Sequence, residues 1–120
     1  MSVTFNGRNA EGWVGDEDAF FNVSNVNARG LLTLLRLPCD EYLCGQADLP
    51  AMRRAIMYAR NTFMRHVGDV TREGYEGFGS GGCRVIEMGV DAAYYARRLL
   101  ELSEHVEKLA AQGATLITWG

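Results

Sequence analysis

The most regular hydrophobic pattern of the chain lies near its C-terminus. Five apolar residues recur there at spacings of four, three, four and three, and they are Tyr95, Leu99, Leu102, Val106 and Leu109. Such spacing puts the side chains on one face of an α-helix. Asp91 is a suitable N-cap residue and Gly113 is a suitable residue to end the helix. The pattern therefore predicts a helix between these two residues.

A second apolar face follows Asp48. Its members are spaced by four, three, four and four residues, and they are Met52, Ile56, Ala59, Phe63 and Val67. Asp48 can cap a helix, Pro50 is tolerated in a first turn, and Gly68 suits the position just after a helix. The sequence thus predicts a helix from Leu49 that ends at Gly68.

A cluster of leucines between residues 31 and 37 predicts one further helix. Polar residues that can cap it precede the cluster, so we expect the helix to begin near Asn25 or Asn27. Pro38 ends it, because the residue before a proline is pushed out of the helical region. Residues 38–47 are then expected to form a loop that is anchored by Tyr42 and Leu43.

Three segments have the aromatic and β-branched composition of strands. They are residues 19–23, residues 115–119 and Val3–Phe5, with an Asn6-Gly7 turn after the last of them. We expect the C-terminal strand to lie beside the strand at 19–23. The chain has no internal repeat or linker. The predicted fold is α+β, with three helices packed on a small sheet that includes the strands at 19–23 and 115–119, in a single compact domain over 1–120.

The stretch from Gly74 to Gly82 contains five of the chain's 14 glycines. Gly77-x-Gly79-x-x-Gly82 matches the spacing of a dinucleotide-binding motif, but that motif works only between a strand and the N-terminus of a helix. Here an extended segment, 83–88, is expected to follow. We interpret 74–82 as a flap whose Tyr75 and Phe78 contact a partner, with a simple hairpin tip as the alternative.

Charge narrows the choice of partner. The net charge is −3, which argues against a general nucleic-acid-coating protein, and eleven of the twelve basic residues are arginine. The second helix carries four arginines and no acid, and one stripe on it comprises Arg54, Tyr58, Asn61 and Arg65. Such a stripe is typical of RNA-binding surfaces. It is equally typical of a solvated face whose arginines pair with acids, here Glu101, Glu104 and Glu107, and the acidic total favours this second interpretation.

No pattern predicts a catalytic or metal site. Cys39, Cys44 and Cys83 have the wrong spacing for structural zinc, and nothing in the sequence brings Cys83 to His66 or His105. We therefore expect no catalytic residue, metal or cofactor. An alternative is a small-ligand or nucleotide-type anion site at the asparagine-rich turn from strand to helix, where free backbone N–H groups converge. Its residues would be Asn22, Asn25, Asn27, Gly77 and Gly79.

One broader pattern combines a strand with Asn-x-Ser-Asn, a leucine-rich helix, a late helix with tyrosine and arginine, and a final apolar strand ending in tryptophan. It covers residues 22–35 and 94–119 and resembles small bacterial and prophage proteins of uncharacterised function. The resemblance implies no activity.

The sequence favours a non-enzymatic interaction module that recognises a protein partner, or its own copy as a homodimer. The expected contact residues are Tyr75, Phe78, Arg84, Arg54, Tyr58, Arg65 and Trp13. An acidic loop over 11–18 is expected to fold Trp13 back as an anchor. With no signal peptide, no apolar run of about 20 residues and an odd number of cysteines, we expect a cytoplasmic protein without membrane contact.

Overall fold

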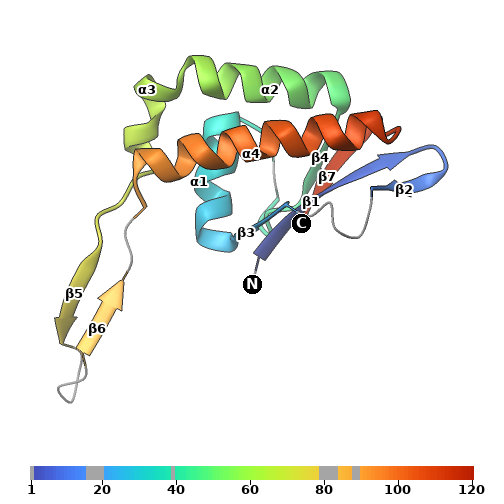
Figure 1. Cartoon of the computed structure of the whole chain (residues 1–120). Helices are drawn as coiled ribbons and strands as arrows, with labels where there is room; N and C mark the ends of the chain where they lie inside the picture. The colour runs from blue at the N-terminus through green and yellow to red at the C-terminus, as the bar shows by residue number, and fades with distance from the viewer. Residues whose placement is uncertain (1, 16–20, 39, 79–83, 88–89) are drawn as a thin grey trace.

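The computed structural model describes residues 2–15, 21–38, 40–78, 84–87 and 90–120. It confirms the predicted α+β class, in which helices lie against a small antiparallel sheet (Figure 1). The strands of the main sheet are β1 (Ser2–Asn9), β2 (Gly12–Val14), β3 (Phe21–Ser24), β4 (Gly45–Asp48) and β7 (Leu116–Trp119). The helices are α1 (Asn25–Leu35), α2 (Leu49–Asn61), α3 (Phe63–His66), the 3₁₀ turn η1 (Val67–Asp69) and α4 (Ala92–Ala111).

Strand β1 organises the sheet. The strand order is β2-β1-β7-β4, and β3 also pairs with β1, so the predicted strands at 19–23 and 115–119 do belong to one sheet. They are not neighbours, however, because β1 lies between them: Phe5 is opposite Phe21 on one side and opposite Trp119 on the other.

The turn predicted at Asn6-Gly7 is wrong, because β1 continues through both residues. Pairing with β7 holds them extended, and Gly7 serves close packing instead of a turn: a Cβ atom there would lie 3.0 Å from the Cβ of Ala114. The chain reverses after Asn9, whose side-chain Oδ1 accepts a 2.9 Å hydrogen bond from the backbone N of Glu11.

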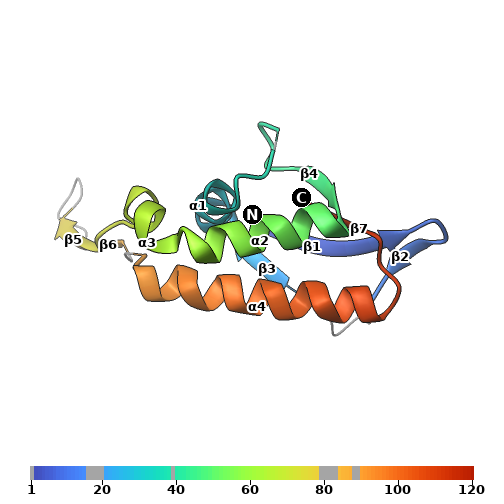
Figure 2. The same ribbon diagram turned by 90° about the horizontal axis from the view of Figure 1, so that it is seen from above.

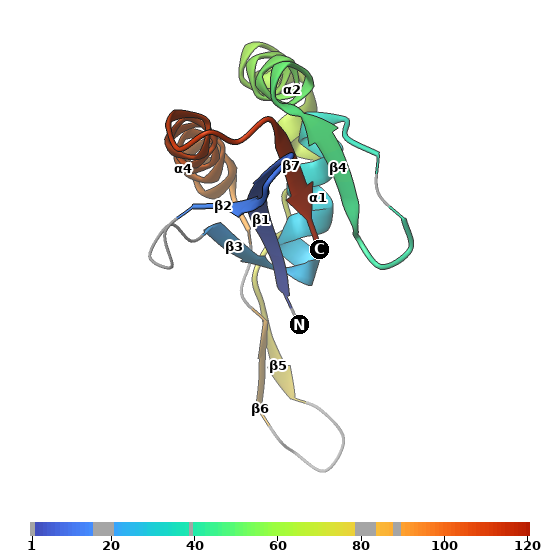
Figure 3. The ribbon, with the colours of Figure 1, turned by 90° about the vertical axis from the view of Figure 1, so that its right-hand side faces the viewer.

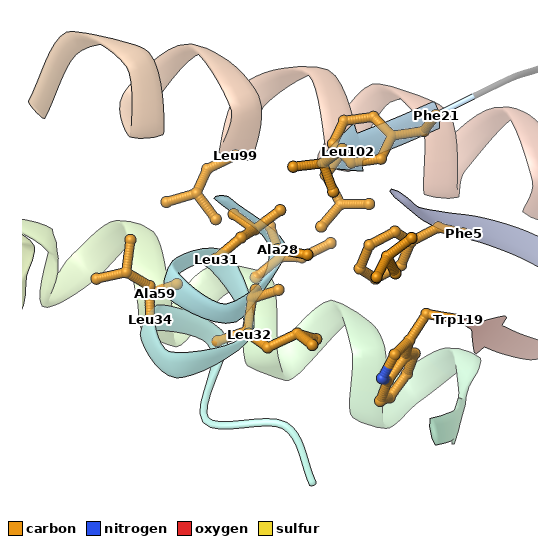
Figure 4. Packing of buried hydrophobic residues seen from close by; sticks show 14 of the residues in the cluster. Phe5, Phe21, Ala28, Leu31, Leu32, Leu34, Ala59, Leu99, Leu102 and Trp119 are labelled. Carbon is orange, nitrogen blue, oxygen red and sulfur yellow. The ribbon is translucent and has the colours of Figure 1, made fainter. Parts of the chain in front are cut away.

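Helices α1, α2 and α4 lie on one side of the sheet (Figure 3). Alternate strand residues such as Val3 and Phe5 point to that side and are buried, whereas Thr4 and Asn6 are on the other face. The buried apolar side chains form one cluster, in which Phe5 stacks on Trp119 and meets Phe21 edge to face (Figure 4). All five predicted core residues of α4 belong to this cluster.

Helix α1 begins where predicted, with Ser24 as N-cap, and ends with Arg36 in the left-handed conformation two residues before Pro38. Its one glycine permits a close contact with α4. A Cβ atom on Gly30 would overlap the hydroxyl group of Tyr95, which donates a 3.1 Å hydrogen bond to the carbonyl oxygen of Val70. Packing of the tyrosine over α1 therefore requires glycine at this position.

The single helix predicted from Leu49 to Gly68 is interrupted at Thr62. Asp48 caps the start as predicted and accepts a 2.8 Å hydrogen bond from the backbone N of Ala51. The buried Thr62 side chain donates to the carbonyl oxygen of Tyr58 at 2.8 Å, a competing bond that favours a bend. Gly68 lies within η1 and does not end α2.

The loop predicted over 38–47 is partly wrong, because β4 pairs with β7 at its end. Leu43 anchors the remaining loop as predicted and is buried. Tyr42 does not anchor it, since 75% of this residue is exposed.

Two strands form a separate hairpin. They are β5 (Tyr75–Phe78) and β6 (Arg84–Glu87), which pair antiparallel, and only their backbone course is described. The extended segment predicted at 83–88 is thus confirmed for 84–87, while the part of the predicted flap at 75–78 is a strand. Residues 79–83 lie outside the described residues. Seen in Figure 1, this hairpin extends away from the helices and the main sheet, and we call it the arm.

Candidate interaction surfaces

The arm lengthens the molecule. The radius of gyration is 16.1 Å and the principal extents are 55 × 30 × 25 Å, whereas a compact chain of this length would have a radius of gyration of about 14 Å. Figure 2 shows the arm at the end of the long dimension. The arm therefore presents its backbone at a distance from the packed core.

The base of the arm is closely held. Arg72 and Val90 exchange two backbone hydrogen bonds, of 2.9 and 2.8 Å. The Arg72 guanidinium donates to Asn27 Oδ1 at 2.9 Å, and Asn27 Nδ2 donates to the Tyr94 hydroxyl at 3.1 Å. These bonds tie the segments that enter and leave the arm to α1 and α4. A cavity of about 670 Å³ lies beside this base, between Thr71 and Ala92.

The predicted arm contacts stand at defined positions of the hairpin. Phe78 is opposite Arg84 in the register, and Tyr75 is opposite Glu87. The side chains of these residues lie outside the described part of the structure. Gly77 is within β5, and β6 follows it, so the local order is strand–strand and differs from the strand–helix order that dinucleotide binding needs. Gly79 lies outside the described residues.

Helix α2 presents a basic face. Arg54 and Arg60 of α2, and Arg65 of the following α3, are exposed, and within the described residues none of them forms an ion pair. Arg53 differs from them, because it binds Glu107 of α4 through two hydrogen bonds of 2.8 and 2.9 Å. This pairing raises the pKa of Arg53 and lowers the pKa of Glu107. Pairing with an acid of α4 is therefore present at Arg53, next to the predicted stripe, while the stripe arginines Arg54 and Arg65 have no such partner within the described residues.

The predicted stripe on α2 includes an aromatic stack. The Arg36 guanidinium lies 5.0 Å from the centre of the Tyr58 ring, and the His66 ring stacks on Tyr58 at 6.4 Å and 25°. The stack brings α1, α2 and α3 together and half-buries Tyr58. Arg54 lies one turn before Tyr58 on α2, whereas Arg65 is on α3, beyond the interruption at Thr62, so the predicted stripe does not continue along one helix to Arg65.

A cleft of about 500 Å³ lies between α2 and α4. Met57 and Arg60 line it from α2, Ser103 lines it from α4, and the Arg53–Glu107 pair borders it. No sequence pattern by itself predicted this cleft. The sequence does contain a corresponding pattern, because Arg53, Met57 and Arg60 share a second stripe of α2 at spacings of four and three. That stripe becomes one wall of a groove only because α4 packs beside it.

Large apolar side chains are exposed on α2, α3 and α4. The exposed fractions are 63% for Met57, 48% for Leu100 on α4 and 84% for Met64 on α3. Leu100 precedes Ser103 by one helical turn and so lies on the same side of α4. Exposed methionines combined with arginines are typical of protein-binding surfaces.

The asparagine-rich turn is occupied by internal contacts. Asn22 Nδ2 donates to the hydroxyl groups of Ser2 and Thr4, both at 2.8 Å, so this side chain ties β3 to β1. Asn27 is engaged by Arg72 and Tyr94. Of the three predicted ligand-binding asparagines, Asn25 alone has no side-chain hydrogen bond within the described residues. The turn therefore gives a ligand few free groups.

Trp13 lies on the open face of the sheet, and its predicted role as a folded-back anchor is wrong. It is 69% exposed, with the Arg8 guanidinium 4.7 Å from the centre of its ring. A depression of about 540 Å³ lies next to it, with Asn6, Gln46 and Thr118 in its lining. Trp13 is thus accessible to a partner, but it is on β2, at the opposite end of the molecule from the arm (Figure 1).

The histidines considered for catalysis lie in unrelated surroundings. His105 is buried and stacks on Phe21, and its Nε2 donates to the Phe5 carbonyl oxygen at 2.9 Å. Burial lowers its pKa. His66 belongs to the Tyr58 stack, and Cys83 lies outside the described residues. Within the described ranges, no group of three histidine, cysteine or acidic side chains is arranged to hold a metal ion.

No protein-family model, curated protein or solved structure matches the chain. The resemblance to small bacterial and prophage proteins therefore stays an expectation. As far as the structure describes the chain, none of its helices combines the length and the apolar character that a membrane span requires.

Proposed function

We propose that this chain is a non-enzymatic protein–protein interaction module, which contacts a protein partner or a second copy of itself through the arm and the exposed face of α2. The observation that carries the proposal is the arm, a two-stranded hairpin that extends away from the packed core. An isolated two-stranded hairpin is only marginally stable in water, and both its edges offer unpaired backbone groups. Contact with a partner would stabilise the hairpin and would pair the backbone groups at its edges.

The surface of α2 supports the same function. Arg54 and Arg60 are exposed and have no ion-pair partner within the described residues, and Met57 is exposed on the same helix. Charged and apolar groups side by side give a protein interface both orientation and buried area. We further propose that residues 1–120 act as one domain in the cytoplasm.

The two alternatives have less support. A small ligand at Asn22 and Asn27 would compete with the hydrogen bonds that these side chains make to β1, Tyr94 and Arg72. RNA contact through Arg54, Tyr58 and Arg65 would have to overcome a net charge of −3. Each remains an outcome of the test below.

The test is affinity capture from the native host with the tagged full chain and with a Tyr75→Ser/Phe78→Ser variant. We expect the variant to keep the melting temperature of the wild type and to lose the captured protein. Tyr42→Ser is the matched control, because it removes an exposed aromatic from the loop before β4, and capture should be unchanged. A large drop in melting temperature for the double variant, or equal capture, would contradict the proposal.

Self-association and the alternatives need their own readouts. Mass in solution that rises with concentration, and no longer rises for the double variant, would identify a second copy as the partner. RNA binding would instead show an affinity that falls steeply with salt, and a metabolite would raise the melting temperature. If no protein is captured, salt-dependent RNA binding would favour RNA contact and stabilisation by a metabolite would favour a ligand site, in place of the interaction module.

A further inference from the structure

The cleft between α2 and α4 has the form of a groove for a third helix. The two helices run in opposite directions, since the Arg53–Glu107 pair joins the start of α2 to the end of α4 (Figure 2). Neighbouring helices in such a pair leave a groove in which another helix can pack. The buried Ile56 lies in the lining, and the volume of about 500 Å³ is enough for several side chains of an occupant.

The apolar side of the groove is unpartnered. Met57 is 63% exposed in the lining, and Leu100 is 48% exposed one turn before Ser103 on α4. Exposing such large side chains costs free energy that burial against a partner recovers. Methionine also adapts its shape readily, so Met57 can pack against different apolar side chains of an occupant.

Charge distinguishes one side of the groove from the other. Arg60 lines the cleft, Arg54 is exposed on the same helix, and neither has a carboxylate partner within the described residues. Helix α2 carries no acid of its own. On the side of α4, Glu107 is already bound to Arg53. An occupant is therefore complementary when it carries acids along the side that faces α2.

A protein helix fits this site better than a nucleic acid does. Arg60, which is unpaired within the described residues, and Arg53, which is paired with Glu107, are seven residues apart, so the α2 edge of the cleft spans about 10 Å, or two helical turns. A short peptide bound in the cleft interacts electrostatically mainly with this edge, because charges farther than about 8 Å away are screened at physiological ionic strength. A long polyanion would also meet the acidic remainder of the chain, whose total charge is −3.

We infer that the α2–α4 cleft binds an amphipathic helix of a protein partner, with apolar residues at i, i+4 and i+7 against Met57 and Leu100 and with acids facing Arg60. The inference rests on the proposed function and names the chemistry of the partner segment. The arm would then add a second contact to the same partner.

The probe for this site is a fluorescent synthetic helix of about 15 residues, long enough to be partly helical alone. It carries leucines at i, i+4 and i+7 and glutamates on one flank, and its matched control has lysines in place of the glutamates. We expect the glutamate peptide to bind roughly tenfold more tightly than the lysine peptide, because its charge is complementary to α2. Amide chemical shifts should change in α2 and α4.

Single substitutions locate the binding surface. Met57→Ser and Arg60→Ser should each weaken binding of the glutamate peptide about fivefold or more. Val26→Ser and Arg29→Ser are the matched controls, since Val26 is 62% exposed and both residues lie on the exposed side of α1. All four residues contribute little to the core, and the melting temperature of each variant checks that the fold is intact. Equal effects of cleft and control substitutions would overturn the inference.

Other occupants give distinguishable results. Stronger binding of the lysine peptide, or of an oligouridine RNA whose affinity depends on Arg60 but not on Met57, would overturn the inference. A dimer that Met57→Ser dissociates would assign the cleft to a second copy, which also overturns it. If the peptide fails to bind while Tyr75→Ser/Phe78→Ser still abolishes capture, the helix occupant is wrong and the proposed function stands. If capture alone fails, the proposed function is wrong.

Discussion

Arg72 and Val90 close the base of the arm by exchanging both of their backbone hydrogen bonds. Such a hydrogen-bonded pair is the one that flanks a two-residue turn in a tight hairpin. The chain instead inserts residues 73–89 between the two, which include both strands of the arm. The backbone pair of Arg72 and Val90 thus joins the two chain segments at the base of the arm, whatever the length of the segment between them.

Replacement of residues 73–89 by Asn-Gly is therefore expected to leave the fold intact. The dipeptide supplies a type I′ turn for the pair, and the shorter loop lowers the entropy cost of closure by about 0.6 kcal/mol for each halving of its length. The melting temperature should be equal to or above that of the wild type, as measured by circular dichroism. Partner capture should be lost together with the arm.

Two outcomes would contradict this prediction. A clear loss of cooperativity in thermal unfolding would show that the arm stabilises the core. Undiminished capture of the partner would show that the arm makes no contact, and the interaction would then have to be assigned to α2 alone. A variant with Asn-Gly inserted in place of Tyr42 and Leu43 is unsuitable as a control, because Leu43 is buried.

The helices could be predicted because their signals are local. The spacing from Tyr95 to Leu109 and the caps at Asp48 and Asp91 lie within single elements, and all of them are confirmed. The signals that failed depend on distant partners. The segment Gly45–Asp48 has no strand composition and becomes β4 by pairing with β7. The turn signal at Asn6-Gly7 is overridden by the same strand β7.

The candidate site was less predictable than the fold, for the same physical reason. The stripe with Arg54 and Tyr58 lies on one helix and could be identified, but Arg36, which stacks on Tyr58, comes from the end of α1. Met57 is an apolar residue outside the buried face of α2, and its place in the cleft becomes clear only once α4 is positioned beside α2. The asparagine-rich turn predicts a ligand for Asn22, and nothing local indicates its actual partners on β1, which are 18 and 20 residues away in the sequence.

Two adjacent arginines of α4 should differ sharply in their effect on stability. Arg98 is 16% exposed in its side chain, donates to the carbonyl oxygen of Asn22 and to Glu101, and lies 4.1 Å from the centre of the Phe21 ring. Its removal would leave the Asn22 carbonyl without this donor and uncover Phe21. We expect Arg98→Ala to lower the free energy of unfolding by about 2–3 kcal/mol, the usual cost of losing a buried hydrogen bond to a charged group.

Arg97→Ala is the matched control for this measurement. Arg97 is 66% exposed in its side chain, and its contacts among the described residues are an i,i+4 ion pair with Glu101 and a contact with the Tyr94 ring. Exposed pairs of this kind contribute about 0.5 kcal/mol or less. Urea unfolding of both variants checks the contrast. Similar losses for the two would show that Arg98 does not hold β3 against α4.

The buried His105 should make stability depend on pH in a defined window. Burial lowers its pKa below the ordinary value of 6.5. The hydrogen bond to the Phe5 carbonyl raises the pKa by a smaller amount, and the positive charge of Lys108 lowers it slightly further. In the unfolded chain the histidine takes up a proton at about pH 6.5, whereas the folded protein resists protonation. The unfolded state therefore binds more protons as the pH falls below 6.5, and the free energy of unfolding decreases. Urea unfolding at pH 7.5 and 5.5 should reveal this decrease in the wild type. His105→Gln removes the titrating group and should unfold with nearly equal free energy at both pH values, although its stability at pH 7.5 is lower by about 1–3 kcal/mol because a buried hydrogen bond is disturbed. His66→Gln, which changes a histidine outside the core, should retain the decrease of the wild type. The lowered pKa of Glu107 cannot account for the effect, since that group loses its stabilising charge only below its ordinary value of 4.5. An unchanged pH dependence in His105→Gln would mean that another group is responsible for the loss of stability between pH 7.5 and 5.5.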